Sequence, residues 1–119
     1  MQRFEAKSFD DPDSTRECEG KGTLQVISVG NRMVAKTHLE PGWQWSDNVR
    51  PIDGGELCEW SHLAYCVSGR MRFYFRDGTQ ADLTPGQVAF IPGGHDAEVI
   101  GDEACVMLDF GEVAEYARR

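Results

Sequence analysis

Two histidines occur where the side chains of a β-rich domain can converge on one metal ion or one substrate. His62 begins an apolar segment that ends in a glycine turn at Gly69, and His95 follows the corner Pro92-Gly93-Gly94. Imidazole is a common ligand of transition metals, and it is also a general acid or base near neutral pH. The pair therefore predicts a metal site or an acid–base site.

A metal site would need further donors, and the sequence offers several. A catalytic zinc-type site uses three protein ligands. The candidates besides the two histidines are Cys66, Asn48 and the loop carboxylates Asp53, Glu56 and Glu59. Each has a structural alternative, since a histidine in a β domain often serves as a hydrogen-bonded core residue, and a buried cysteine behaves as a small hydrophobe. Both interpretations stay open.

The apolar pattern from residue 23 onward predicts the strands that position these groups. Short apolar runs separated by turn residues are typical of an all-β sandwich or barrel. Gly30-Asn31 and Asp77-Gly78 each predict a tight hairpin turn. We expect about eight strands, enough to close a barrel around a small ligand. The predicted strands are 23–29, 33–39, one that begins at His62, 70–75, 80–83, 88–91, 97–100 and 105–110, and a short helix is predicted over 112–119.

Strand alternation predicts which side chains face the barrel interior. Side chains at positions i and i+2 lie on the same face of a strand. His62, Ala64 and Cys66 therefore share one face, and His95 shares a face with Ala97. The small Ala64 side chain leaves room beside the His62 imidazole. We expect both histidines to point inward.

An irregular segment, 46–61, precedes the first candidate histidine and lies between tryptophans. Loops of this length often cover or line binding sites. Trp43, Trp45 and Trp60 predict either the lining of an apolar ligand pocket or a plug for one end of the barrel. Arg50 is a candidate for a two-pronged pair with a substrate carboxylate, with an ion pair to a nearby acid as the alternative.

Composition limits the partners of the chain. Its 119 residues fit one domain, in which 1–22 form a polar N-terminal arm and 23–119 form the barrel. The net charge of −8, with no Lys/Arg cluster, argues against nucleic acid as a partner. No apolar run approaches the ~20 residues that a bilayer crossing needs, and the first five residues lack the apolar core of a secretion signal, so we expect a cytoplasmic protein without membrane contact.

The four cysteines form no Cys-x-x-Cys pair, which excludes a zinc knuckle and a thioredoxin-type motif. In a reducing compartment we expect free thiols. Cys18 and Cys58 fall in predicted loops, where we expect them to be accessible.

The turn residues resemble those of the conserved-barrel cupins. The resemblance rests on Gly69-Arg-Met, Asp77-Gly-Thr, Pro85-Gly-Gln-Val and Ile91-Pro-Gly-Gly94, and it covers about residues 33 to 110. It implies a double-stranded β-helix, or jelly-roll barrel, with an N-terminal extension. It also implies a divalent metal held by motif histidines and a glutamate, and a homodimer.

The ligand positions of the two cupin motifs hold other residues in this chain. Asn48 and Arg50 occupy the positions of the two histidines of the first motif, and His62 occupies the position of its glutamate. Ala97 occupies the position of the second motif's histidine, so His95, two residues earlier and on the same strand face, is the candidate replacement.

Two functions remain open from the sequence. In the first, His62 and His95 hold a divalent transition metal (Zn, Fe, Ni or Mn) beside a small oxygenated or carboxylated molecule; the resemblance then implies oxygenase, isomerase or lyase chemistry. In the second, the same cavity is a metal-free binding or sensing module, with a ligand held between the tryptophans and Arg50. The loss of the first histidine pair favours the second, and the inward His95 favours the first. A third possibility, an interaction protein that works through its sheet surface as a homodimer, lacks support in strand 70–75, where arginines line the outer face.

Overall fold

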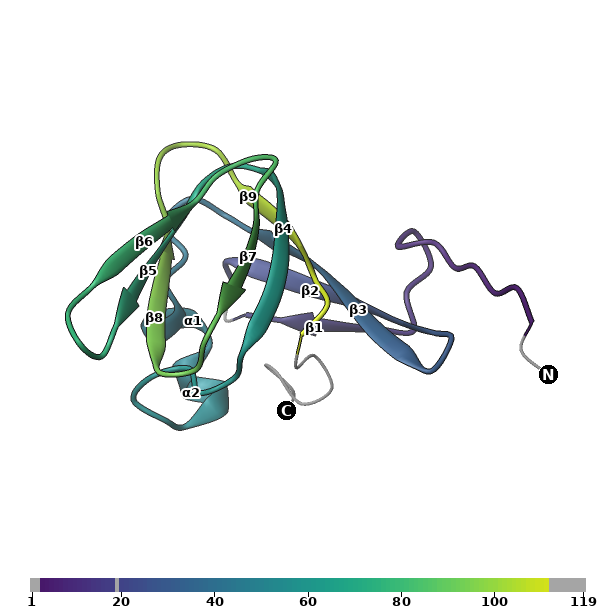
Figure 1. Ribbon diagram of the computed structural model, residues 1–119, viewed down its shortest axis with the longest axis horizontal. Helices are drawn as coiled ribbons and strands as arrows, with labels where there is room; N and C mark the ends of the chain where they lie inside the picture. Colours follow the sequence, from purple (N-terminus) through teal and green to yellow (C-terminus); the bar gives the residue numbers. More distant parts are fainter. Residues whose placement is uncertain (1–2, 19, 112–119) are drawn as a thin grey trace.

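Two antiparallel β-sheets face each other in the computed structural model, which describes residues 3–18 and 20–111 (Figure 1). One sheet has six strands in the order β1-β2-β3-β9-β4-β7, and the other has three in the order β6-β5-β8. The strands are β1 (Ser14–Glu17), β2 (Gly22–Val29), β3 (Arg32–Leu39), β4 (His62–Ser68), β5 (Met71–Phe75), β6 (Gln80–Leu83), β7 (Val88–Ile91), β8 (His95–Val99) and β9 (Cys105–Asp109). The predicted all-β jelly-roll architecture is confirmed.

The hairpin turns read from the sequence are present. β2 pairs with β3 around Gly30 and Asn31, whose φ angles are 57° and 62°. Both residues are thus left-handed, as the turn that matches strand twist requires, and glycine and asparagine tolerate this conformation best. β5 and β6 pair across a longer turn that contains Asp77 and Gly78, in which Gly78 has a φ of 89° and its amide donates to the Phe75 carbonyl over 2.9 Å.

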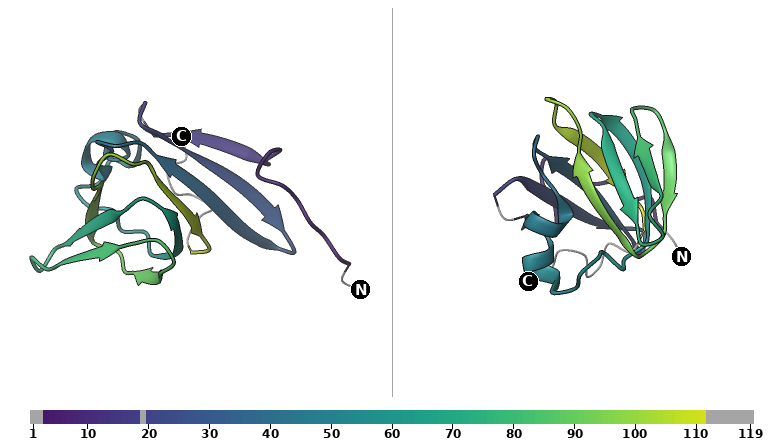
Figure 2. Two further views of the ribbon diagram at one scale, coloured as in Figure 1. Left: turned by 90° about the horizontal axis from the view of Figure 1, so that it is seen from above. Right: turned by 90° about the vertical axis from the view of Figure 1, so that its left-hand side faces the viewer.

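The N-terminal arm contributes a strand to the larger sheet. β1 pairs with β2, with Ser14 opposite Val26. Upstream of β1, Asp13 accepts a hydrogen bond of 2.7 Å from the Ser28 amide, and Glu5 accepts one of 2.8 Å from the Gly30 amide. The arm therefore follows the β2–β3 hairpin, which projects away from the three-stranded sheet (Figures 1 and 2).

Three local expectations need correction or fall outside the structure. The segment predicted to be irregular contains two helical turns, α1 (Trp45–Asn48) and α2 (Arg50–Asp53). Each has four residues, which is too short for a helical period to be detected in the sequence. Cys18 and Cys58 are buried instead of accessible, because backbone pairing draws both loops against the sheets. The helix predicted over 112–119 lies outside the described residues.

The core lies between the two sheets, and strand alternation is as predicted. Along β4 the side chains alternate between buried and exposed, with His62, Ala64 and Cys66 inside. Along β8, His95 and Ala97 face inward. Both histidines therefore project from facing sheets into the same interior. Neither described helix approaches the length that a membrane crossing requires.

The outer face of β4 and β7 is apolar. Leu63 lies opposite Phe90 and Tyr65 lies opposite Val88 in the strand register. Phe90 is 68% exposed and Val88 is 64% exposed. The sequence did not indicate this outer face, hereafter the β4–β7 face; the strand considered for a surface contact was the arginine-bearing strand β5.

Candidate metal centre

The imidazole rings of His62 and His95 meet inside the barrel. Their centroids are 5.4 Å apart and the ring planes are inclined by 65°. His62 is 8% exposed and His95 is 2% exposed, so both rings are withdrawn from solvent. The inward orientation predicted from strand parity is confirmed for both.

A buried carboxylate fixes the His62 ring. His62 Nδ1 lies 2.6 Å from Asp109 Oδ2, and Asp109 Oδ1 accepts a second hydrogen bond of 2.9 Å from the Gly111 amide. A carboxylate can only accept, so Nδ1 carries a proton, and in the neutral ring the lone pair is on Nε2. This carboxylate–histidine pair is the arrangement that orients a histidine for metal binding.

A backbone carbonyl fixes the His95 ring in the same tautomer. His95 Nδ1 donates to the Pro92 carbonyl over 2.8 Å, which leaves the lone pair on Nε2. Burial lowers the pKa of His95 to about 4. The ring is therefore neutral at physiological pH, and no proton competes with a metal for Nε2.

Cys58 supplies a third donor. Its Sγ lies 3.7 Å from His62 Nε2. Its backbone forms a bridge with His95, with a Cys58 N to His95 O bond of 2.7 Å and a His95 N to Cys58 O bond of 3.1 Å. The potential ligand atoms of Cys58, His62 and His95 all lie within 4.8 Å of one another, and all three residues are buried.

A thiol and two imidazole lone pairs are a donor set that transition metals use. Zinc takes cysteine and histidine ligands, and three protein ligands leave a position open for water or substrate. Iron and nickel also accept imidazole and thiolate, whereas manganese prefers oxygen donors. The residues present therefore fit a transition metal, and of the four metals expected from the sequence manganese fits them least.

Gly93 allows the Cys58 loop to reach β8. A Cβ at Gly93 would overlap the carbonyl oxygen of Glu59, the residue after Cys58. The neighbouring Gly94 amide donates to the Cys58 carbonyl over 2.7 Å. The glycine corner before His95 thus serves to bring the thiol and the imidazole together.

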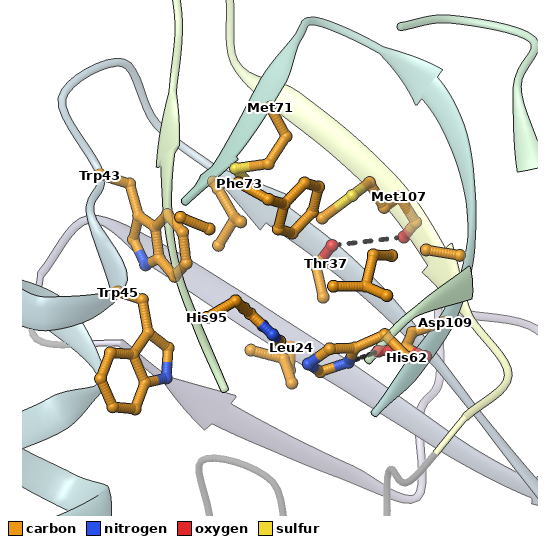
Figure 3. A pocket seen from close by; sticks show the side chains of 14 residues that line it. Leu24, Thr37, Trp43, Trp45, His62, Met71, Phe73, His95, Met107 and Asp109 are labelled. Atoms are coloured by element: carbon orange, nitrogen blue, oxygen red, sulfur yellow. Dashed lines mark hydrogen bonds and ion pairs between the residues drawn. The ribbon is translucent and has the colours of Figure 1, made fainter. Parts of the chain in front are cut away.

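A small cavity is lined by two of the three donors, His62 and His95 (Figure 3). Its volume is about 40 Å³, and its wall is mostly apolar. Both sheets and the segment before α1 contribute to it. The lining residues are Leu24, Thr37, Leu39, Trp43, Trp45, His62, Ala64, Met71, Phe73, Ile91, His95, Ala97, Met107 and Asp109.

Two tryptophans form one side of this wall. Trp43 is 2% exposed and Trp45 is 1% exposed, and neither indole Nε1 has a hydrogen-bond partner among residues 3–18 and 20–111. Their backbone is held to β8, since Val99 N donates to the Trp43 carbonyl over 2.9 Å and Asp96 Oδ1 accepts from the Ser46 amide over 3.1 Å. The rings are fixed in place by the segment that carries them.

No family model and no curated protein matches the chain in sequence. Solved structures match its fold. An RmlC-like cupin from Shewanella frigidimarina NCIMB 400 has a TM-score of 0.61 at 22% identity, with 97% of each chain covered. The protein has the cupin fold.

Larger proteins share this cupin fold. Oxalate decarboxylase from Bacillus subtilis matches with a TM-score of 0.62 at 22% identity, over 92% of this chain and 30% of its own. The oxalate decarboxylase formate complex from Lactobacillus farciminis matches with a TM-score of 0.63 at 19% identity, over 94% of this chain and 34% of its own. The chain thus spans about a third of the length of these decarboxylases, and at such identities the likeness establishes the fold alone.

Of the cupin motif positions, that of His62 supplies a donor to the described group, whereas those of Asn48, Arg50 and Ala97 do not. Asn48 is buried in α1, where its Oδ1 accepts from the Gln44 amide over 3.0 Å, and Arg50 is exposed in α2. Trp60 packs half-buried against the core, and the Cys66 thiol points to the carbonyls of Ser68 and Gly69. Asn48, Arg50, Trp60 and Cys66 do not line the described cavity, whereas Trp43 and Trp45 do.

Sequence reasoning missed Cys58 and Asp109. Cys58 lies in a segment without regular alternation, so no pattern indicated that it faces inward. Asp109 carried a weak signal: it is an acid on the inward parity of an otherwise apolar strand, β9, whose burial alternates as Cys105, Met107 and Asp109. A buried carboxylate requires a partner. That requirement could have directed attention to a histidine.

Proposed function

We propose that Cys58, His62 and His95 bind one divalent transition metal ion, zinc foremost, and that the adjoining cavity binds a small oxygenated or carboxylated molecule. The observation that carries this proposal is the convergence of three buried donor atoms, two of them imidazole nitrogens whose other ring nitrogen is already hydrogen-bonded. Two histidines whose Nδ1 atoms are already hydrogen-bonded present Nε2 as the ligand atom for a cation.

Each residue has a distinct role in this proposal. The Cys58 thiol gives up its proton as it becomes a ligand. Asp109 holds the proton of His62 on Nδ1 and balances positive charge at the centre. The Pro92 carbonyl holds the proton of His95 on Nδ1. The apolar wall, which includes Met71, excludes bulk water and strengthens electrostatic interactions inside.

A bound metal ion with an open position would act as a Lewis acid toward an oxygen of the substrate. Zinc has no redox chemistry, so the cysteine and histidine donor set favours an isomerase or lyase over an oxygenase. Two of the structurally similar proteins are named for the decarboxylation of oxalate, a small carboxylate, which is in keeping with the small cavity of this chain.

The experiment is metal analysis of the untagged full chain, followed by titration with Co²⁺ as a spectroscopic probe. We expect one equivalent of metal, with a near-ultraviolet charge-transfer band from the thiolate. Cys58→Ser should abolish this band. The matched control is Cys66→Ala, which removes a buried thiol outside the cavity and should leave the band unchanged.

Less than about a tenth of an equivalent of any transition metal, before and after reconstitution, would overturn the metal proposal. If small carboxylates then raise the melting temperature equally with and without a chelator, the metal-free binding module is the correct function.

A further inference from the structure

We propose that the indole N–H groups of Trp43 and Trp45 form the subsite that recognises the ligand, and that this ligand is a small carboxylate. The inference deepens the proposed function and rests on it, because His62 and His95 of the proposed metal centre line the same cavity as the two tryptophans. The two indole N–H groups are the polar atoms that would select the ligand.

The first observation is that both indole nitrogens are buried donors with no acceptor in the part of the chain that the structure describes. Nearly all buried N–H groups in folded proteins have a partner, and a donor left without one destabilises the fold. Here two such donors come from residues separated only by Gln44, and both residues line the same cavity. In Figure 3 the Trp45 nitrogen is on the side of its ring that faces the other lining residues, and the Trp43 nitrogen is on the ring edge toward Trp45.

The second observation is that the segment that carries these buried rings is bonded to β8. Asp96 follows His95 in β8 and accepts hydrogen bonds from the Ser46 amide and, over 3.4 Å, from Gln44 Nε2. Gln44 also forms a backbone bridge with Glu98 of β8. The strand that presents His95 therefore also fixes both tryptophans, so that the donors and the metal-binding atoms keep a constant relationship.

The cavity wall offers hydrogen-bond donors that lack a partner among the described residues, so it favours a ligand with hydrogen-bond acceptors. An indole can donate and cannot accept. Among the residues described as lining the cavity there is no lysine or arginine, and Asp109, the one carboxylate, already has both oxygens hydrogen-bonded. A ligand must therefore bring its own acceptor oxygens. A carboxylate brings two in one planar group and forms the stronger, charge-assisted bonds with N–H donors.

The volume restricts the ligand to a small one. One water-sized group occupies roughly 10–15 Å³ of a cavity. The cavity of about 40 Å³ therefore holds about three or four such groups. A carboxylate group with one attached carbon is of this size. Acetate and formate are therefore the probes, and the metal at Cys58, His62 and His95 would supply the positive charge that offsets burial of the anion.

The first test uses the wild-type full chain, so that no variant needs to fold. Protein labelled with ¹⁵N and loaded with zinc is titrated with sodium acetate while the indole N–H resonances are recorded. We expect the Trp43 and Trp45 signals to move downfield with one common Kd and the Trp60 signal to stay in place, because Trp60 does not line the cavity. If acetate moves neither signal, or if sodium chloride moves them equally, the carboxylate subsite is overturned.

The second test removes each N–H while keeping an aromatic ring. Trp43→Phe and Trp45→Phe should each weaken acetate binding about tenfold, measured by calorimetry, and leave zinc affinity within about twofold. Trp60→Phe is the matched control and should change neither value. Acetamide, which has the shape of acetate without its charge, should bind at least about tenfold more weakly than acetate.

The outcomes separate this inference from the proposed function. If zinc binds but Trp43→Phe and Trp45→Phe hold acetate as tightly as wild type does, the subsite is wrong and the metal centre stands. If no zinc binds while acetate still shifts both indole signals, the metal centre is wrong and the indole subsite stands as a metal-free site.

Discussion

His62 Nδ1 and Asp109 Oδ2 lie 2.6 Å apart in the barrel interior, although 47 residues separate them in the sequence. β4 and β9 are neighbours in the larger sheet, so the two side chains project from adjacent strands toward the same cavity. The Gly111 amide donates to the other carboxylate oxygen. The carboxylate is therefore held in position from one side and holds the imidazole on the other.

Asp109→Asn should weaken metal binding about 10–100-fold, as is usual when the partner of a metal-binding histidine is changed. The amide can accept from Nδ1 but carries no charge, so His62 becomes a poorer donor. Zinc affinity measured by competition with a chromophoric chelator checks this. Asp82→Asn is the control, because Asp82 pairs with Arg72 at the surface and should leave the affinity unchanged. Equal affinities in all three proteins would show that Asp109 does not act on the centre.

Gly93→Ala should separate Cys58 from His95. A Cβ at this position overlaps the Glu59 carbonyl, which is backbone and must move as a whole, and the Cys58 loop moves with it. We expect the Co²⁺ thiolate band to weaken strongly. The control is Gly86→Ala, where φ is +89° and no atom lies within 4 Å of the added carbon. That variant is strained and less stable, but its spectrum should be that of wild type. A full band in Gly93→Ala would show that the corner does not position the thiol.

The barrel and half of the site could be predicted because both depend on local rules. The glycine and asparagine at 30 and 31 specify the hairpin turn, and alternation along β4 and β8 places both histidines inside. Cys58 could not be predicted, because it faces inward through a single bridge with His95, a contact between segments without a shared pattern. The motif positions Asn48 and Arg50 lie outside the described cavity for a related reason: two helical turns replace the extended chain there, so strand alternation does not apply.

The stability of the protein should fall as the pH rises above 9, through Cys105. Burial, together with the adjacent Cys66 thiol and Glu103, raises the pKa of Cys105 to about 12, from an ordinary value of 9.0. At a pH between these two pKa values, the Cys105 thiol is deprotonated in the unfolded chain and protonated in the folded chain. The unfolded state then binds fewer protons, so the free energy of unfolding decreases with pH, by up to ~1.4 kcal/mol per pH unit.

Urea unfolding at pH 8, 9 and 10 checks this dependence. Cys105→Ala should have a lower free energy of unfolding at pH 8 and a shallower decline between pH 9 and 10. A smaller part of the decline persists in that variant, since burial also raises the pKa of Cys66. Parallel declines in the wild type and Cys105→Ala would contradict the assignment to Cys105.

The homodimer expected from the sequence stays a prediction, and we propose the β4–β7 face as its interface, with a second copy of the chain as the occupant. The paired side chains on this face, Leu63 with Phe90 and Tyr65 with Val88, carry no charge. The chain as a whole has a net charge of −8, which favours contact between two copies at a patch without charged side chains. A two-fold axis would bring the same apolar patch of each copy together.

Phe90→Lys should therefore convert a dimer into a monomer, as measured by light scattering after size-exclusion chromatography. Phe4→Lys is the matched control, since Phe4 is 96% exposed on the arm and lies outside this face. The monomeric variant should keep its zinc affinity, because the metal-binding side chains point to the opposite side of the sheet. A wild-type chain that is monomeric at every concentration tested, or a Phe90→Lys variant that remains dimeric, would exclude this interface.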